Sequence, residues 1–234
     1  MSCGNTVDYI RTVGAPRETM TAALEAFKRL DGIEVNVSGR YGDLAVEITR
    51  SDNVPKNEYS VVYRNAVSIL NEYIYALENV PLADRLVQLL KLRKAIFSVA
   101  ESFTGGGVGK RIVEISGASE IFFEGLNTYS NKSKIERLGV EEEVIEKYGA
   151  VSKETAYQMA LGLLKSGNCG ISVSTTGIAG PNSDGTNKPV GLVYIGIGYG
   201  GEVKVYGYNL KGTRQEITET AINFALFLAF KTVK

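Results

Sequence analysis

A buried strand, a glycine-rich turn and a helix start follow one another over residues 95–116, and this succession restricts the possible folds more than any other feature. The stretch AIFSVA, residues 95–100, is apolar enough for a buried strand. Three consecutive glycines, residues 105–107, permit a tight turn, and the following VGKRIVEI is typical of a helix. A strand that passes through such a turn into a helix is a building unit of a layered α/β fold.

The same turn has the properties of an anion-binding site. Backbone N–H groups converge at a helix N-terminus, where the helix dipole also favours negative charge. The named phosphate motifs are absent, however. A Walker loop would need glycine at Thr104 and serine or threonine at Arg111, and a dinucleotide motif would need glycine at Lys110. Two interpretations stay open here: an anion site of another kind, and a turn that only packs tightly between strand and helix.

The chain has no histidine among its 234 residues, which restricts the chemistry open to an enzyme. Ser–His and Cys–His catalysis and histidine-built zinc sites are excluded. Two cysteines, Cys3 and Cys169, are too few for a cysteine zinc site. A hydrolase would have to use Lys, Asp, Glu or Tyr as its general base, and we expect neither a metal nor a cofactor.

Charge, cysteine content and hydropathy indicate where the protein works. The formal net charge is zero, which argues against nucleic acid as a partner. Two distant cysteines suggest no disulfide framework and fit a reducing cytoplasm. No signal peptide is visible, and the most apolar stretch, residues 222–230, is far shorter than the roughly 20 residues of a membrane span. We therefore expect a cytoplasmic protein with no membrane contact.

Residues 1–83 are expected to form a small α+β domain. The spacing of apolar residues predicts helices over residues 17–30 and 57–77. Between them, apolar and polar residues alternate on both sides of GRYGD, which is a hairpin signal. The resulting αββα unit is KH-like in content. In a KH module the GxxG loop joins two helices, whereas Gly39 and Gly42 lie in the hairpin, so we interpret them as a turn.

Residues 84–234 are expected to form a layered α/β domain with a mixed sheet. Strand patterns cover residues 95–100, 121–130, 169–176, 190–198 and 202–210, and helical patterns cover residues 82–94, 106–116, 131–139, 141–149, 152–167 and 213–231. Thr213 and Glu216 match a capping box at the start of the last helix. Such interleaving predicts parallel and antiparallel pairing within one sheet.

Polar residues gather directly after three of these strands. They lie in the glycine-rich turn, in NTYSNKSK (residues 127–134) and in STTGIAGPNSDGTNKPVG (residues 174–191). Open α/β sheets bind ligands at the carboxyl ends of their strands. Each segment alone could be an ordinary loop, but together the three point to one pocket.

Lys134 is the candidate general base in that pocket. If Asn131 caps the following helix, Lys134 is the third helical residue, where the helix dipole disfavours a cation. Burial would lower its pKa further from the reference value of about 10.4 and leave a neutral amine near pH 7. The alternative is a solvated surface lysine, which is our interpretation of Lys132.

Ordered motifs in the second region resemble the C-terminal domain of the CinA family. They are AESFTGG, SGASEIFFEG, TYSNKSKIERLGV, YGAVSKETA, TTGIAGP and KPVGLVYI, and the resemblance runs from about residue 86 to the end. The family comprises the competence/damage-inducible proteins, whose enzymatic members are nicotinamide-nucleotide amidohydrolases. Residues 1–83 resemble the small middle domain of long members. The molybdopterin-binding-like domain that opens those members has no counterpart in the sequence, so we expect its activity to be missing.

The resemblance implies hydrolysis of the carboxamide of nicotinamide mononucleotide to nicotinate mononucleotide and ammonia, by a Ser–Lys mechanism that needs no histidine. By motif, Ser119 would be the nucleophile, with Ser102 as the alternative. Lys134 would be the base with Tyr129 beside it, and Thr176 would help to hold the oxyanion. The implied substrate-binding residues are Glu101, Thr104, Gly105, Gly106, Gly107, Asn131, Gly177 and Arg214.

With this resemblance, the glycine-rich turn is expected to have two roles. Its glycines and the helix start would receive the single phosphate of the substrate, and Glu101, Ser102 and Thr104 would line the pocket of the amide. The sequence departs from the family at one visible place, because the usual Cys of AESCTGG is Phe103. The larger ring would either crowd the pocket or point into the core.

Two other functions stay open from the sequence. A non-catalytic nucleotide-binding or regulatory module could keep the same pocket, and an assay of ammonia release would distinguish it from an enzyme. The N-terminal unit could bind nucleic acid, which salt-dependent binding would reveal. We also expect a homo-oligomer, with a dimer favoured.

Overall fold

The computed structural model describes residues 5–183 and 185–234. The chain divides into two compact units, Met1–Leu82 and Ala83–Lys234. Cys3 lies outside the described residues, and Cys169 is a buried free thiol. Within the described ranges, no helix combines the length and the apolar character that crossing a membrane requires.

The N-terminal unit is a four-stranded antiparallel sheet with two helices. Its sheet order is β2-β3-β1-β4. The elements are β1 (Thr6–Val13), α1 (Arg17–Leu24), the 3₁₀ helix η1 (Glu25–Arg29), β2 (Ile33–Arg40), β3 (Asp43–Arg50), α2 (Lys56–Leu70), η2 (Asn71–Tyr73) and β4 (Ile74–Ala76). The predicted helix–hairpin–helix order is present, and a strand, β1, precedes it. The helix expected over residues 57–77 is corrected at its end, because α2 stops at Leu70 and residues 74–76 form β4. The complete order, β-α-β-β-α-β, is that of the ferredoxin-like split βαβ unit.

The hairpin turn between β2 and β3 explains the GxxG sequence. Arg40 pairs with Asp43, which leaves Tyr41 and Gly42 as a two-residue loop. Both loop residues have positive φ, 54° and 77°. Two successive positive φ values are the signature of a type I′ hairpin turn. The prediction of a turn at this place is confirmed.

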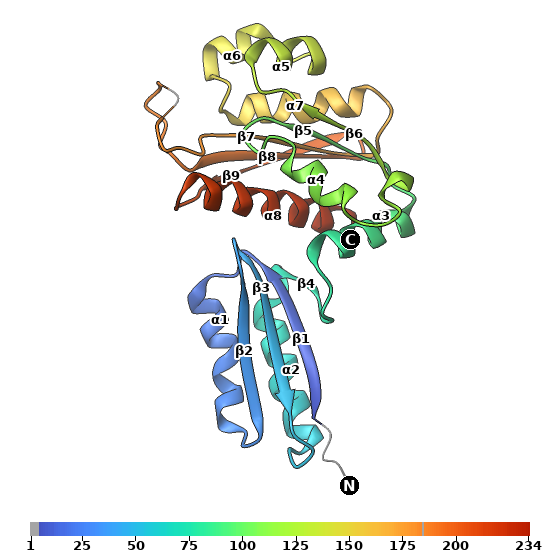
Figure 1. The fold of residues 1–234 in the computed structure, drawn as a ribbon, viewed down its shortest axis with the longest axis vertical. Helices are drawn as coiled ribbons and strands as arrows, with labels where there is room; N and C mark the ends of the chain where they lie inside the picture. Colours follow the sequence, from blue (N-terminus) through green and yellow to red (C-terminus); the bar gives the residue numbers. More distant parts are fainter. Residues whose placement is uncertain (1–4, 184) are drawn as a thin grey trace. The chain divides into compact units, whose positions relative to one another are not determined.

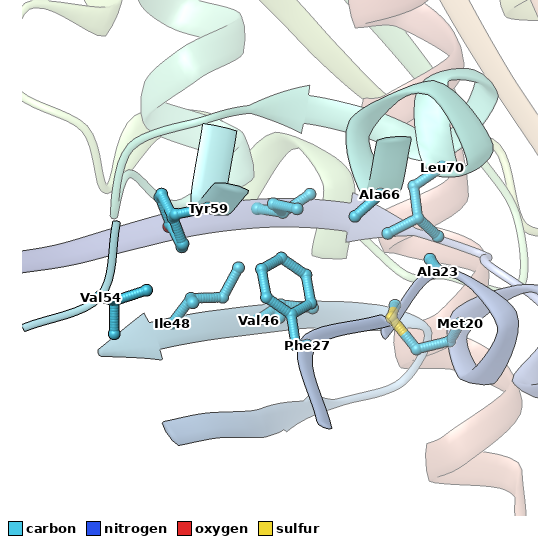
Figure 2. Close-up of a cluster of buried hydrophobic side chains, with 10 residues drawn as sticks. Met20, Ala23, Phe27, Val46, Ile48, Val54, Tyr59, Ala66 and Leu70 are labelled. Carbon is cyan, nitrogen blue, oxygen red and sulfur yellow. The ribbon is translucent and has the colours of Figure 1, made fainter. Parts of the chain in front are cut away.

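One face of this sheet packs against both helices. Ile10 pairs with Val46, and the side chains of directly opposed residues lie on the same face. Figure 2 shows Val46 and Ile48 of the sheet beside Phe27 of the first helical segment. The alternation that the sequence shows on both sides of the hairpin therefore places one apolar set inside.

The C-terminal unit is built on a five-stranded mixed sheet in the order β6-β5-β7-β8-β9. The strands are β5 (Phe97–Glu101), β6 (Phe122–Asn127), β7 (Ile171–Gly177), β8 (Leu192–Tyr199) and β9 (Glu202–Asn209). The helices are α3 (Leu82–Arg93), α4 (Gly107–Val113), η3 (Ala118–Glu120), α5 (Asn131–Leu138), α6 (Glu142–Tyr148), α7 (Lys153–Lys165) and α8 (Arg214–Val233). β5 pairs in parallel with β6 and β7, whereas β7, β8 and β9 pair antiparallel. The predicted mixed sheet is confirmed.

Helices cover both faces of this sheet. Figure 1 shows α5, α6 and α7 on one side and α3, α4 and α8 on the other. Ser172 and Ser174 of β7 donate to the carbonyls of Ala160 and Ala156 and so hold α7 close to the sheet, at 2.8 and 2.6 Å. At the start of α8, Thr213 accepts from the N–H of Glu216 and Glu216 accepts from the N–H of Thr213, so the predicted capping box is confirmed.

The carboxyl ends of the three parallel strands meet at one edge of the sheet. β5 ends at Glu101, paired with Asn127 of β6 and Thr175 of β7. The three polar segments that follow these strands therefore begin side by side. The three segments start at one edge of the sheet, where the candidate site lies, and the single pocket stays a prediction.

Candidate active site

Lys134 and Ser102 are in hydrogen-bonding contact at this edge. The Lys134 Nζ lies 3.1 Å from Ser102 Oγ, 2.8 Å from the carbonyl oxygen of Thr128 and 3.1 Å from that of Tyr129. Lys134 comes from α5, which follows β6, and Ser102 is the first residue after β5. The Lys134 side chain is 1% exposed. The fold thus buries an amine directly against one serine hydroxyl.

Burial determines the protonation of that amine. No carboxylate in the described part of the chain contacts Lys134, and burial lowers the pKa of its ammonium from the usual value to about 8. A neutral amine has two N–H donors and one lone pair. The carbonyls of Thr128 and Tyr129 can take the two donors, which leaves the lone pair to accept the proton of Ser102. The direction of the predicted pKa shift is confirmed.

The cap of α5 is Ser130, and the expectation for Asn131 is corrected. Ser130 has extended backbone, and its hydroxyl accepts from the N–H of Ser133 at 3.1 Å. Asn131 is the first helical residue, which makes Lys134 the fourth. A one-residue shift of the helix start changes no side chain of the site, because Lys134 stays on the face that packs inward.

Several hydrogen bonds fix the position of Ser102. Its N–H donates to the carbonyl of Thr175 on β7 at 3.0 Å, and its carbonyl accepts from Gly105 at 3.1 Å. Beside it, the hydroxyls of Thr104 and Thr175 are 2.6 Å apart. In the part of the chain that the structure describes, the N–H groups of Phe103 and Thr104 have no hydrogen-bond acceptor. Two unpaired donors therefore lie directly after the serine.

Glu101 fills the position that was expected for a phosphate. Its Oε2 accepts from the N–H groups of Gly106 and Val108, at 3.1 and 3.0 Å, and its Oε1 accepts from Gly109 at 2.8 Å. The N–H groups of Gly105 and Gly107 donate to backbone carbonyls. The glycine-rich turn is thus an anion site whose anion belongs to the chain itself. The expectation that Gly105–Gly107 hold the substrate's phosphate, and that Glu101 lines the amide pocket, is corrected.

Ser119 lies far from Lys134, so its expected role as nucleophile is corrected. It belongs to η3, which precedes β6, whereas Lys134 follows β6. The six residues of β6 separate them by about 20 Å at roughly 3.3 Å per residue. Ser119 instead borders a surface hollow of about 520 Å³ between Val113 and Phe122. The general rule that ligands bind at the carboxyl ends of strands could have identified Ser102 from the sequence.

Thr176 and Gly177 have structural contacts. The Thr176 hydroxyl donates to the carbonyl of Ala150 at 2.7 Å, so it faces the turn before α7 and not Ser102. Gly177 lies so close to Val193 of β8 that a Cβ atom would not fit. The expectation that Thr176 holds the oxyanion is therefore corrected.

Three more residues singled out from the sequence differ in their surroundings. Tyr129 is 67% exposed, and its contact with Lys134 is through its backbone carbonyl. Arg214, the first residue of α8, is exposed and donates to the carbonyl of Gly180 at 2.7 Å. Phe103 packs among core residues that include Val193 and Ile217. Its ring points into the core, which answers the question left open by the sequence.

Lys188 was not identified from the sequence, and its side chain holds the loop after β7 in place through hydrogen bonds. Lys188 donates to the carbonyls of Tyr148 and Val151, each at 2.6 Å. These bonds tie the loop after β7 to the turn between α6 and α7. A lysine in a loop rich in Gly, Asn and Pro gives no sequence signal of such a contact.

Over the described residues, no group of three or more His, Cys, Asp or Glu side chains could hold a metal ion.

Three comparisons relate the chain to known proteins. The model of the CinA C-terminal domain matches residues 79–233. A CinA-like protein from Kosmotoga olearia is 40% identical over 205 residues, which cover 86% of this chain and 50% of that protein. A relative from Clostridium acetobutylicum, named as a competence-damage inducible protein, is 45% identical over 154 residues, covering 66% of this chain and 38% of that protein.

A solved structure also resembles a large part of the chain. The competence/damage inducible protein CihA from Agrobacterium tumefaciens has a TM-score of 0.61 and 36% sequence identity, with coverage of 64% of this chain and 93% of that one. The chain spans half the length, or less, of the two curated relatives described above.

Proposed function

The chain belongs to the CinA family, and on that premise we propose that its C-terminal unit is an amidohydrolase. Its substrate is nicotinamide mononucleotide, and its products are nicotinate mononucleotide and ammonia. The family match over residues 79–233 supports the class of protein. The choice of substrate follows from the motif resemblance to nicotinamide-nucleotide amidohydrolases.

The contact between Ser102 and Lys134 is the observation that carries this proposal. The 3.1 Å distance from Oγ to Nζ allows direct proton transfer. A buried lysine with a pKa of about 8 is partly neutral at physiological pH and needs no histidine to act as a base. An activated hydroxyl with a base in contact is the arrangement required for nucleophilic catalysis.

The first half of the reaction forms an acyl-enzyme. Ser102 Oγ attacks the carboxamide carbon while Lys134 takes the hydroxyl proton. The free N–H groups of Phe103 and Thr104 are the candidate donors to the resulting oxyanion. Lys134 then gives its proton to the amide nitrogen, the C–N bond breaks, and ammonia leaves.

The second half restores the serine. Water attacks the ester carbon, and the now neutral Lys134 accepts one of its protons. The C–O bond to Ser102 breaks, Lys134 returns the proton to Oγ, and the nicotinate product leaves. One amine therefore acts as base and acid in turn, and the net reaction consumes one water molecule.

The phosphate of the substrate needs a cation, because Glu101 already occupies the glycine-rich turn. Arg214 is exposed, and its contact within the described residues is to a neutral group, the carbonyl of Gly180 in the loop after β7. We assign the phosphate to Arg214.

We further propose that residues 1–83 form the middle-type domain of the family and that the protein works in the cytoplasm as a homodimer. Light scattering of the purified protein tests the dimer.

Ammonia release from the mononucleotide tests the proposal. Wild type should release ammonia and nicotinate mononucleotide in equal amounts. Ser102→Ala should lose several orders of magnitude in kcat, as removal of a serine nucleophile does in other hydrolases, and should still bind the mononucleotide. Ser119→Ala is the matched control and should keep wild-type turnover.

Two outcomes contradict the proposal in different ways. If wild type binds the mononucleotide but releases no ammonia, the protein is the non-catalytic nucleotide-binding module. If Ser119→Ala is inactive and Ser102→Ala turns over, the assignment of the nucleophile is wrong.

A further inference from the structure

Glu101 is a buried carboxylate that the proposed reaction does not use. Its side chain is 1% exposed, and the residue ends β5 directly before Ser102. Buried carboxylates are costly unless hydrogen bonds satisfy them. Three backbone N–H groups of the turn and the first part of α4 do so here, at 2.8–3.1 Å.

These bonds make Glu101 the link between three elements around the serine. Its backbone carbonyl accepts from the N–H of Thr128 at the end of β6, at 2.8 Å. Its carboxylate holds the start of α4, and the next residue is anchored to Thr175 of β7. The carbonyl of Thr128 is itself an acceptor of Lys134. A displacement of Glu101 would therefore move the serine and one of the two carbonyls that orient the amine.

The N–H donors around Glu101 also require a carboxylate and not a carboxamide. Both of its oxygens accept hydrogen bonds, Oε2 from two donors and Oε1 from one. A glutamine of the same size would present an NH₂ group to at least one N–H donor, because a carboxamide has only one oxygen. The N–H donors of the turn and of α4 face both oxygen positions of the side chain, and only a carboxylate places an acceptor at each position.

We infer that Glu101 is a positioning residue: its carboxylate replaces an external anion at the glycine-rich turn and holds Ser102, with the N–H groups of Phe103 and Thr104, in the geometry for attack. This inference rests on the proposed hydrolysis at Ser102. It assigns Glu101 no contact with the substrate. It predicts a loss in the chemical step with little loss in binding.

The test compares Glu101→Gln and Glu101→Ala with the matched control Glu114→Gln, which alters an exposed glutamate at the other end of α4. Displacing a reacting group by about 1 Å can cost about a hundredfold in rate. Both Glu101 variants should therefore lower kcat by about tenfold to a hundredfold, with KM nearly unchanged. Glu114→Gln should match wild type.

Chemical rescue separates positioning from a general loss of structure. The Glu101→Ala variant has space and unpaired N–H donors where the carboxylate was, so sodium formate should raise its kcat in a saturable way. Sodium chloride at equal ionic strength should not, and wild type should respond to neither. The rate at which phenylmethylsulfonyl fluoride labels Ser102 should follow the same pattern, and this second readout needs no knowledge of the natural substrate.

The outcomes are distinguishable from failure of the proposed function. If wild type labels at Ser102 but releases no ammonia, the proposed substrate is wrong, and the labelling rates decide on Glu101. A Glu101→Ala variant with wild-type kcat and labelling, or with rates that formate leaves unchanged, overturns the inference. If the alanine variant does not fold, Glu101→Gln decides: unchanged kcat and labelling reject the inference, and a lower kcat at constant KM supports it.

Discussion

The amine of Lys134 is buried among neutral groups, so desolvation determines its charge. Two backbone carbonyls and one hydroxyl surround it, and the pKa falls to about 8. Lys132, two residues earlier, is exposed and lies 3.7 Å from Glu136. The difference between these lysines comes from the helix face on which each one lies. Their contrasting environments provide a matched pair for mutagenesis.

Lys134→Ala should remove hydrolysis, because no other base contacts Ser102 in the described part of the chain. Lys134→Arg should fail as well, since a guanidinium keeps its proton. Steady-state ammonia release measures both variants, and Lys132→Ala serves as the control with normal turnover. Near-normal turnover of either Lys134 variant would show that another group is the base.

The rate should depend on pH through the same lysine. Only the neutral amine can take the proton of Ser102, and the pKa of about 8 sets its population. We expect log kcat/KM to rise with a slope of one below pH 8 and to level off above it. A pH profile of kcat/KM between pH 6 and 10 measures this. A profile that is flat across pH 8 contradicts Lys134 as the titrating base.

At the scale of elements, the ends of parallel strands decide which polar residues meet. Ser102 follows β5 and Lys134 follows β6, so both lie at the carboxyl edge of the sheet. Ser119 precedes β6 and therefore lies near the amino end of that strand, away from the carboxyl ends where Ser102 and Lys134 meet. The backbone N–H groups of Val108 and Gly109 at the start of α4 already donate to the carboxylate of Glu101. The phosphate therefore has to be recognised outside this turn.

Arg214→Ala should raise KM for nicotinamide mononucleotide and leave kcat nearly unchanged. Loss of a charge-assisted hydrogen bond costs about 1.5–3 kcal/mol, which is about tenfold to a hundredfold in binding. Nicotinamide riboside lacks the phosphate, so its KM should be the same for wild type and variant. KM measurements of both compounds with both proteins test this. An equal effect on the riboside would exclude a phosphate role for Arg214.

At the scale of the whole molecule, two units have separate cores. The N-terminal core gathers residues such as Ile10, Phe27 and Leu70. The C-terminal unit has its own clusters, one on the α5–α7 side and one that includes Phe103. Every residue of the Ser102–Lys134 site comes from the C-terminal unit. We therefore expect folding and catalysis of that unit to need no residue from the N-terminal one.

A fragment of residues 83–234 should fold and keep ammonia release within about threefold of the full chain per site, since the Ser102–Lys134 contact and the core clusters around it lie within this unit. Circular dichroism and the ammonia assay measure the two properties. A folded but inactive fragment would show that the N-terminal unit contributes to the site.

Local patterns in the sequence were sufficient for much of the architecture. The strand–glycine–helix succession, the hairpin at Tyr41–Gly42 and the capping box of Thr213 depend on neighbours along the chain, and each is present in the structure. The sequence pattern predicts residues 74–76 as the end of a helix, and they form β4 instead, because three residues are too few to show a strand pattern of their own. The absence of histidine is likewise a property of the sequence alone, and it excludes Ser–His catalysis whatever the fold.

The tertiary structure decided which of these residues face one another. The motif resemblance leaves Ser102 and Ser119 as alternatives, and in the structure it is Ser102 that contacts Lys134. The glycine-rich turn looked ready for a phosphate, but Glu101 folds back onto it from the preceding strand. The sequence determined the elements because their propensities are local. The site depended on side-chain direction and long-range contact, which are set only when the sheet is assembled.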